Sequence, residues 1–310
     1  MLQPRTTVVV LAGGTGGAKL ARGMLDIVGE DLVVVANTGD DIDIYGAHVS
    51  PDPDLVSFWL ADRIDERGWG LEGDTFTVMD GLRALGADVW FNLGDRDLAW
   101  CLERRRRLDA GQGPTEALAA LGAAIGTGGR VLPMCDEQVR TRVRTPAGWT
   151  AFQEFMIRLR AAEPIVEVAF DGADAARPTA AVLEAIARAR AIVIGPSNPI
   201  ISIGPILAVP GMRAALRAAA APVVAVSPLV GGAVLKGPTA AFMEGAGLPV
   251  STAGIVQAYA GIADALLADE ADGVHDLPVR LADTLMGDAA TRRAVAAEAL
   301  DLADAVRMGP

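Results

Sequence analysis

The hydrophobic positions of the chain alternate between short apolar runs and helically spaced stretches, which is typical of an α/β protein. Residues 7–12 and 32–36 are mostly consecutive aliphatic residues. Such runs are typical of strands that are covered on both faces of a parallel sheet. Between them, residues 18–25 place apolar side chains at helical intervals. This β-loop-α-β unit predicts a doubly wound, mostly parallel, Rossmann-like sheet.

The same alternation continues along the chain. The spacing predicts helices at residues 54–63, 74–85, 95–108, 115–125, 180–189, after Pro210, and at 289–306, and strands at 89–92, 191–194 and 222–226. Residues 139–145 instead alternate with a period of two, which indicates a half-exposed strand. We therefore expect one α/β domain over residues 1–310, with a smaller inserted lobe around residues 130–170.

Composition and charge exclude several classes of protein. The chain has 310 residues, of which 51% are hydrophobic and 21% charged, so a folded core is expected and disorder is not. Its 27 basic and 39 acidic residues give a net charge of -12. A broad electrostatic surface for nucleic acid or anionic lipid is therefore not expected. An anionic ligand must be bound by local features.

The remaining composition indicates a cytoplasmic protein without a membrane span. The apolar run near the N-terminus is too short for a secretory signal. Residues 191–212 carry no charge, but four prolines make them a poor membrane helix. Cys101 and Cys135 have no partner motif, which excludes a disulfide scaffold or a zinc ribbon and favours reduced, buried thiols.

A glycine-rich loop lies between the first strand and the first helix, where backbone N–H groups can meet a phosphate. It consists of Gly13, Gly14, Thr15, Gly16 and Gly17. No serine or threonine follows Lys19, so the loop is not a Walker motif, and Lys19 stands at the third glycine position of the dinucleotide motif. The second strand leads to Asn37 instead of an acidic residue, which argues against NAD. The loop predicts phosphate binding, with a tight packing turn as the alternative.

Acidic residues cluster after the second strand. Five carboxylates fall within fifteen positions that contain no lysine or arginine: Asp40, Asp41, Asp43, Asp52 and Asp54. Carboxylates at the end of a strand can hold Mg²⁺ beside a substrate phosphate, but a solvated loop has the same composition. His48, within this segment, is either a base or an ordinary hydrogen-bonding residue.

Two later loops offer further polar groups. Ser197 and Asn198 follow a buried strand between two prolines and expose a hydroxyl and an amide. The chain contains only two lysines, Lys19 and Lys236, and both lie beside glycine-rich turns. A compact ammonium there can meet a phosphate. A plain turn and a solvated lysine are the alternatives, and the arginine run 104–107 is most simply a solvated helix face.

Several motifs in order resemble one known family, the 2-phospho-L-lactate transferases of coenzyme F420 biosynthesis. The motifs run along most of the chain: residues 13–19, 37–41, 50–54, 67–70, 90–99, 195–199 and 202–207. The resemblance implies that a phospholactyl or phosphoenolpyruvyl group passes from a guanosine diphosphate-linked donor to the ribityl hydroxyl of the deazaflavin Fo. GMP would be released with the assistance of Mg²⁺. It also implies a homodimer, and it leaves open which three-carbon acid the donor carries.

With this resemblance, roles can be assigned to the candidate residues as hypotheses. The glycine loop and Lys19 would bind the donor diphosphate, and Ser197 and Asn198 the guanosine. Asp40 and Asp54 would be the catalytic aspartates and hold Mg²⁺, with Asp41 as a second candidate. A carboxylate near the metal, either one that binds Mg²⁺ or a neighbouring one, would accept the proton of the ribityl hydroxyl. The other expected substrate contacts are Trp90, Asn92 and Asp95 on the deazaflavin side, together with Asn37 and Lys236.

A related family of nucleotide-sugar-binding regulators, the gluconeogenesis-factor proteins, has a similar glycine loop and provides the alternative function. Such a regulator would bind its ligand without catalysis. The Pro51–Asp54 and Gly94–Asp97 motifs resemble the transferases more closely. Deazaflavin binding distinguishes the two, since only the transferase requires it.

Overall fold

A seven-stranded parallel sheet forms the centre of the molecule in the computed structural model, which describes residues 6–235 and 237–309. The strand order is β14-β13-β10-β9-β1-β2-β5. The bounds are β1 (Val8–Ala12), β2 (Leu32–Ala36), β5 (Arg130–Pro133), β9 (Ala191–Ile194), β10 (Val223–Val226), β13 (Ala265–Ala268) and β14 (Val279–Leu281). Every pair in this sheet is parallel. The predicted doubly wound α/β fold is confirmed.

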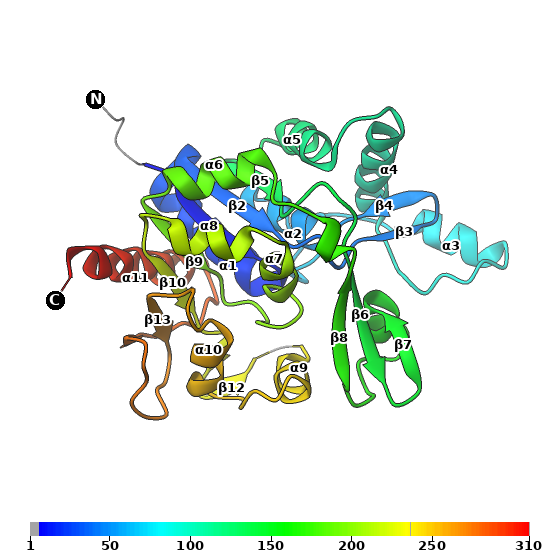
Figure 1. Cartoon of the computed structure of the whole chain (residues 1–310). Coiled ribbons are helices and arrows are strands. Elements are labelled where there is room, and N and C mark those ends of the chain that lie inside the picture. The colour runs from blue at the N-terminus through cyan, green and yellow to red at the C-terminus, as the bar shows by residue number, and fades with distance from the viewer. Residues whose placement is uncertain (1–5, 236, 310) are drawn as a thin grey trace.

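Helices cover both faces of the sheet, which explains why its inner strands are apolar at every position (Figure 1). Val8 and Val10 face α1 (Gly14–Val28), α2 (Pro51–Leu60) and α11 (Ala289–Met308). Val9 and Leu11 point to the opposite face. The helices there are α6 (Ala180–Arg188), α7 (Gly204–Ala208), α8 (Met212–Ala218) and α10 (Thr252–Ala258).

The direction of strand addition reverses between β1 and β9. From β1 the chain adds β2 and β5 on one side, whereas β9, β10, β13 and β14 extend the other side. In open α/β sheets, ligands bind beyond the carboxyl ends of the strands at such a switch point. The glycine loop leaves β1, and the loop of Ser197 and Asn198 leaves β9.

A helical lobe follows β2 and packs around its own apolar core. It contains the hairpin β3 (Ile42–Ile44) and β4 (Ala47–Val49) with α3 (Thr77–Ala84), α4 (Asp95–Asp109) and α5 (Pro114–Ile125). The strand predicted at residues 89–92 is wrong, because this segment is irregular. The Phe91 N–H donates to the Tyr45 hydroxyl at 3.1 Å instead of to a neighbouring strand, and its ring packs on the core of the lobe.

A second projection consists of three antiparallel strands in the order β7-β6-β8. These are β6 (Arg140–Thr145), β7 (Gly148–Ala151) and β8 (Glu167–Asp171). Alternate residues of β6 are buried, as the period-two pattern predicted. The sheet extends from the body at the lower right of Figure 1 and occupies most of the segment expected to form an inserted lobe. β5, by contrast, belongs to the main sheet.

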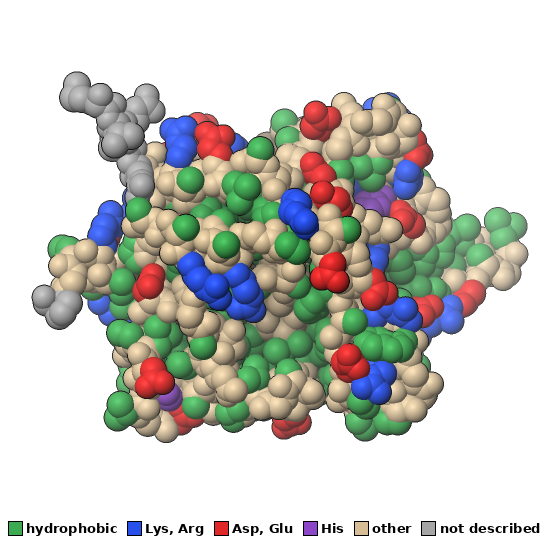
Figure 2. Space-filling model, viewed as in Figure 1, with side chains coloured by type: hydrophobic (Ala, Val, Ile, Leu, Met, Phe, Trp, Pro, Cys, Tyr) green, Lys and Arg blue, Asp and Glu red, His purple; other side chains and the backbone are tan. Residues whose placement is uncertain are grey.

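A short hairpin and a further helix lie between β10 and α10, namely β11 (Leu229–Val230), β12 (Ala233–Val234) and α9 (Thr239–Gly245), and three short helical turns cover Gly29–Asp31, Glu154–Arg158 and Ala173–Ala175. Cys101 and Cys135 are buried free thiols, as predicted. On the face shown in Figure 2, acidic and basic side chains are interspersed and form no continuous basic surface. Within residues 6–235 and 237–309, no helix is both long and apolar enough to cross a bilayer.

Candidate functional site

A cavity of about 470 Å³ opens at the switch point of the sheet, and we call it the switch-point cavity. Its walls come from the loops after β1, β2, β9 and β10, from the start of α2 and from the segment after β14. Its lining includes Gly13, Gly14, Thr15, Gly16, Lys19, Asp40, Asp52, Phe152, Gln153, Ser197, Asn198, Thr284 and Met286. The cavity therefore unites most of the glycine loop with the loop after β9, as predicted.

The glycine loop can adopt its position only because Gly16 and Gly17 lack side chains. A Cβ on Gly16 would lie 2.1 Å from the Pro196 carbonyl oxygen. A Cβ on Gly17 would lie 2.7 Å from the Ser197 Oγ, so Gly17 packs against the second loop and does not line the cavity. Helix α1 begins at Gly14, and the first N–H groups of a helix have no partner within it. Its N-terminus therefore offers an anion-binding surface to the cavity.

Lys19 lies on the same wall of the cavity. Its Nζ donates to the Met286 carbonyl oxygen at 3.0 Å, which ties the first turns of α1 to the segment after β14. Lys236, the other lysine expected in the site, lies outside the described residues.

Two buried carboxylates, Asp40 and Asp52, line the switch-point cavity. Asp52 accepts hydrogen bonds from the Gly14 N–H at 2.7 Å and from the Asn37 side-chain amide at 2.9 Å. Burial raises the pKa of Asp52 to about 6. Burial, followed by the charge of Asp52, raises the pKa of Asp40 well above its usual range. Asn37 does not line the cavity but holds Asp52, and its Oδ1 accepts from the Gly39 N–H at 2.7 Å.

The Asp40 carboxylate is incompletely satisfied. Within the described part of the chain its Oδ1 is buried without a hydrogen-bond partner. An unsatisfied carboxylate oxygen beside a second buried carboxylate is an unfavourable arrangement unless a cation joins it. Oxygen ligands of this kind suit Mg²⁺, so Asp40 and Asp52 could hold such an ion.

The structure does not bring Asp54 to Asp40, contrary to the sequence-based pairing. Asp54 is absent from the lining of the switch-point cavity. Its carboxylate instead forms a buried ion pair with Arg104 and accepts a hydrogen bond from the Trp100 Nε1 at 2.7 Å. A metal role for Asp54 stays a prediction, but the carboxylate that accompanies Asp40 is Asp52.

The arginine run on α4 is also less uniform than predicted. Arg105, Arg106 and Arg107 form ion pairs on the helix surface, whereas Arg104 is buried. Asp54, Asp97 and Cys101 come within 4.8 Å of one another, a spacing that could hold a metal. The Arg104 guanidinium already supplies positive charge to Asp54 at that place.

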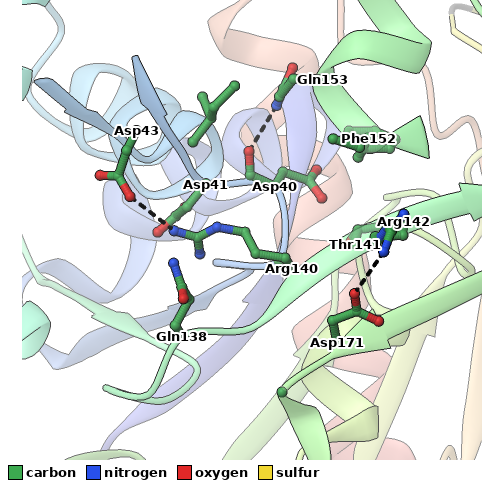
Figure 3. A pocket seen from close by; sticks show the side chains of 14 residues that line it. Asp40, Asp41, Asp43, Gln138, Arg140, Thr141, Arg142, Phe152, Gln153 and Asp171 are labelled. Carbon is green, nitrogen blue, oxygen red and sulfur yellow. Dashed lines mark hydrogen bonds and ion pairs between the residues drawn. The ribbon is translucent and has the colours of Figure 1, made fainter. Parts of the chain in front are cut away.

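A second cavity, of about 600 Å³, adjoins the first, and we call it the hairpin cavity. One wall of this cavity is the end of the loop after β2 together with the start of β3, and the other wall is the three-stranded sheet (Figure 3). Asp40, Phe152 and Gln153 line both cavities, so the two spaces meet at Asp40. The two arginines that line the hairpin cavity face acidic groups. The Arg140 Nη2 lies 3.9 Å from the Asp43 Oδ2, and the Arg142 Nη1 lies 3.5 Å from the Asp171 Oδ2.

Asp41 lines the hairpin cavity within a network of its own. It accepts a hydrogen bond from the Ser50 hydroxyl at 2.7 Å, and its other oxygen lies 3.2 Å from the His48 Nε2. The His48 Nδ1 faces Asp43 at 2.8 Å. Burial lowers the pKa of His48, but hydrogen bonds and charges from both aspartates outweigh it and raise the pKa overall. His48 is therefore an ion-pair partner that fixes Asp41.

Three residues expected on the deazaflavin side lie on neither cavity: Trp90, Asn92 and Asp95. Asn92 accepts a hydrogen bond from Arg83, and Asp95 accepts one from the Val78 N–H at 2.9 Å. The resemblance places them on that side, but residues 89–92 form no strand that would carry them to the edge of the main sheet. Their substrate contacts stay predictions without support from these cavities.

The loop after β9 lies where the sequence placed it. Ser197 accepts a hydrogen bond from the Gly13 N–H at 3.3 Å. The Asn198 Oδ1 accepts from the Ile200 N–H at 2.9 Å, while its Nδ2 is buried without a partner in the described structure. Asn198 therefore keeps an amide donor for a ligand.

Sequence reasoning missed several residues that line the switch-point cavity. Thr284 has a buried hydroxyl without a partner among the described residues, and Phe152 and Gln153 come from the helical segment that directly follows β7. Gln153 donates from its Nε2 to the main-chain oxygen of Asp40 at 2.9 Å. These residues belong to segments that form no recognisable motif, so no local pattern could have indicated them.

Comparisons with known proteins show which family the chain resembles along nearly its whole length. The family model "2-phospho-L-lactate transferase CofD" matches residues 8–310. A phosphoenolpyruvate transferase of Kitasatospora aureofaciens is 40% identical over 97% of this chain and 99% of its own. A 2-phospho-L-lactate transferase of Methanosarcina acetivorans is 37% identical over 96% of this chain and 100% of its own. A solved Bacillus halodurans protein of the UPF0052 family aligns with a TM-score of 0.56 at 18% identity, covering 93% and 90% of the two chains, which shows a shared fold.

Proposed function

The chain belongs to the 2-phospho-L-lactate transferase CofD family, and we propose that it acts in coenzyme F420 biosynthesis with the deazaflavin Fo as acceptor. The donor is a guanosine diphosphate linked to lactate or enolpyruvate. Relatives named for each acid match nearly the whole chain. The observation that carries the proposal is the pair of buried carboxylates, Asp40 and Asp52, opposite the N-terminus of α1.

The donor would occupy the switch-point cavity. Its diphosphate suits the N–H groups at the start of α1 and the Lys19 ammonium, because both favour negative charge. Its guanosine would lie toward Ser197 and Asn198, where the unpartnered Asn198 amide provides a donor. This retains the sequence-based roles of the glycine loop, Lys19 and the loop after β9.

The same cavity suits Mg²⁺ at Asp40 and Asp52. The bound ion would neutralise charge that develops on the transferring phosphoryl group. Support comes from the chain itself, since the Asp40 Oδ1 lacks a partner among the described residues and the pKa of both carboxyls is raised. Asp52 thus takes the place that the sequence analysis gave to Asp54.

The acceptor would approach Asp40 through the hairpin cavity, which meets the switch-point cavity at that residue. A bond forms between the ribityl oxygen and the phosphorus that bears the three-carbon acid. The bond between the two phosphates breaks, and GMP leaves. The hydroxyl proton passes to a carboxylate at the junction, and Asp40 is the group placed there.

Mass spectrometry of a defined reaction tests the proposal. Purified protein is mixed with Fo, Mg²⁺ and donors made from GTP and either 2-phospholactate or phosphoenolpyruvate. We expect a phosphoacyl-deazaflavin that forms only with Mg²⁺, and its mass identifies the acid. If no product forms and Fo does not bind, the transferase proposal is wrong and the regulatory alternative becomes the one to test. Light scattering of the same sample tests the expected homodimer.

A further inference from the structure

Gln153 connects the three-stranded sheet to the centre of the candidate site. It follows β7, and its Nε2 donates to the main-chain oxygen of Asp40 at 2.9 Å across 113 positions of sequence (Figure 3). Gln153 also lines both cavities at their junction. The contact therefore joins an element outside the main sheet to the residue where donor and acceptor would meet.

Aromatic packing holds the main chain on either side of Gln153. Phe152 and Phe155 are buried, and their rings lie 6.3 Å and 5.9 Å from the ring of Phe242 on α9. Buried aromatic clusters restrict the residues that carry them. The Gln153 amide is thus presented from a fixed position.

Main-chain hydrogen bonds hold the turn that carries Asp40, whose Oδ1 has no hydrogen-bond partner in residues 6–235 and 237–309. Two hydrogen bonds hold the residue before it, Gly39. The Gly39 N–H donates to the Asn37 side chain, and the Thr141 N–H donates to the Gly39 main-chain oxygen at 2.7 Å. Gln153 holds the turn at the next residue, Asp40 itself.

We propose that Gln153 is a positioning residue that holds the Asp40 main chain so that its carboxylate faces the junction of the two cavities. The inserted sheet is then part of the catalytic apparatus, although it contributes no reacting group. Loss of this one hydrogen bond is expected to favour local opening of the turn around Asp40 by about tenfold and to lower the rate of group transfer by about tenfold. The kinetic part of this inference rests on the proposed function.

The test uses Gln153→Glu, which keeps the size of the side chain but replaces the donor with an acceptor, and Gln153→Leu, which removes all polarity. Gln257→Glu, at an exposed position on α10, is the matched control for the added charge. Hydrogen–deuterium exchange of the metal-free full chain follows the peptide that covers residues 37–43. Steady-state kinetics of the transfer reaction then separate kcat from the donor KM.

Both Gln153 variants should exchange this peptide about tenfold faster. Their kcat should fall by a similar factor, with the donor KM within about twofold of wild type. The control should match wild type in both measurements. Unchanged exchange overturns the proposal, whatever the rate does, because Gln153 would not then be holding the turn. Faster exchange with unchanged kcat overturns it as well, since the contact would be merely structural. If the wild-type protein transfers no group, the proposed function fails, while the exchange measurement still decides whether Gln153 holds Asp40.

Discussion

Asp40 and Asp54 should respond in opposite ways to removal of their charge, although the sequence assigns them the same role. Asp54→Asn breaks a buried ion pair whose two side chains are each 5% exposed. It leaves the Arg104 guanidinium buried beside a neutral amide. Asp40→Asn instead removes a buried carboxylate whose Oδ1 has no partner in the described structure and whose pKa is raised by burial and by the charge of Asp52.

The expected magnitudes follow from these contacts. Breaking a buried ion pair by removing one partner costs about 3–5 kcal/mol, and Asp54 also loses charge-assisted hydrogen bonds from Trp100 and Arg104. For a domain of this size such a loss lowers Tm by roughly 6–10 °C. Asp40→Asn replaces a carboxyl whose charged form is disfavoured by burial, so its Tm should stay unchanged or rise by about 1–3 °C.

Scanning calorimetry in the presence of EDTA provides the measurement, because bound metal would stabilise wild type through Asp40 and hide the difference. The control is Asp109→Asn, which removes an exposed ion pair with Arg105 on the same helix as Arg104. It should change stability by less than about 0.5 kcal/mol. If Asp40→Asn destabilises the metal-free protein as much as Asp54→Asn does, the division of roles between these aspartates is wrong.

Three further predictions concern the pH dependence of stability, the lack of space at Gly16 and the effect of Mg²⁺ on nucleotide binding. Asp52 and Asp97, whose pKa values burial raises from 3.8 to about 6 and about 7, hold protons that the unfolded chain has released. The free energy of unfolding of the metal-free protein should therefore fall as pH rises from 4 to 7, and urea titrations of Asp97→Asn should show a smaller slope. Gly16→Ala, whose Cβ would lie 2.1 Å from the Pro196 oxygen, should cost about 1–3 kcal/mol in urea unfolding and weaken GDP binding. Gly81→Ala, in open space on α3, should instead stabilise by about 0.5–1 kcal/mol. Isothermal titration should find GDP binding weaker without Mg²⁺, and equal affinity in EDTA would contradict the metal proposal.

The central fold could be predicted because its periodicities are local. Strands covered on both faces are apolar at every position, and the glycine loop marks the first turn between strand and helix. The error at residues 89–92 arose because a short apolar run looks alike in the sequence in two cases. It can pair with a neighbouring strand, or it can be irregular and pack on a helix. Trp90 and Phe91 contact each other edge to face instead of joining a sheet.

That Asp52 and not Asp54 lies with Asp40 in the cavity has a different cause, the start of α2. The sequence predicts this helix from residue 54, but it begins at Pro51. Residues two apart on a helix point about 200° apart. Asp52 and Asp54 therefore face opposite sides, one toward the glycine loop and the other toward α4. The buried partner of Asp54, Arg104, is one of four consecutive arginines, and nothing in such a run indicates which of them is buried.

The first turn of α2 thus joins two parts of the molecule through two neighbouring carboxylates. Arg104 neutralises Asp54 on the side of the helical lobe, whereas Asp52 remains beside Asp40 in the cavity. Among the residues that the structure describes, the positive groups there are the start of α1 and Lys19, and Lys19 already contacts the Met286 carbonyl. A diphosphate entering this space adds negative charge to two buried carboxylates, which is unfavourable in a low-dielectric environment. The cavity becomes electrostatically suited to its donor when a divalent cation enters with the diphosphate, and the acidic pair is the part of the chain that would hold it.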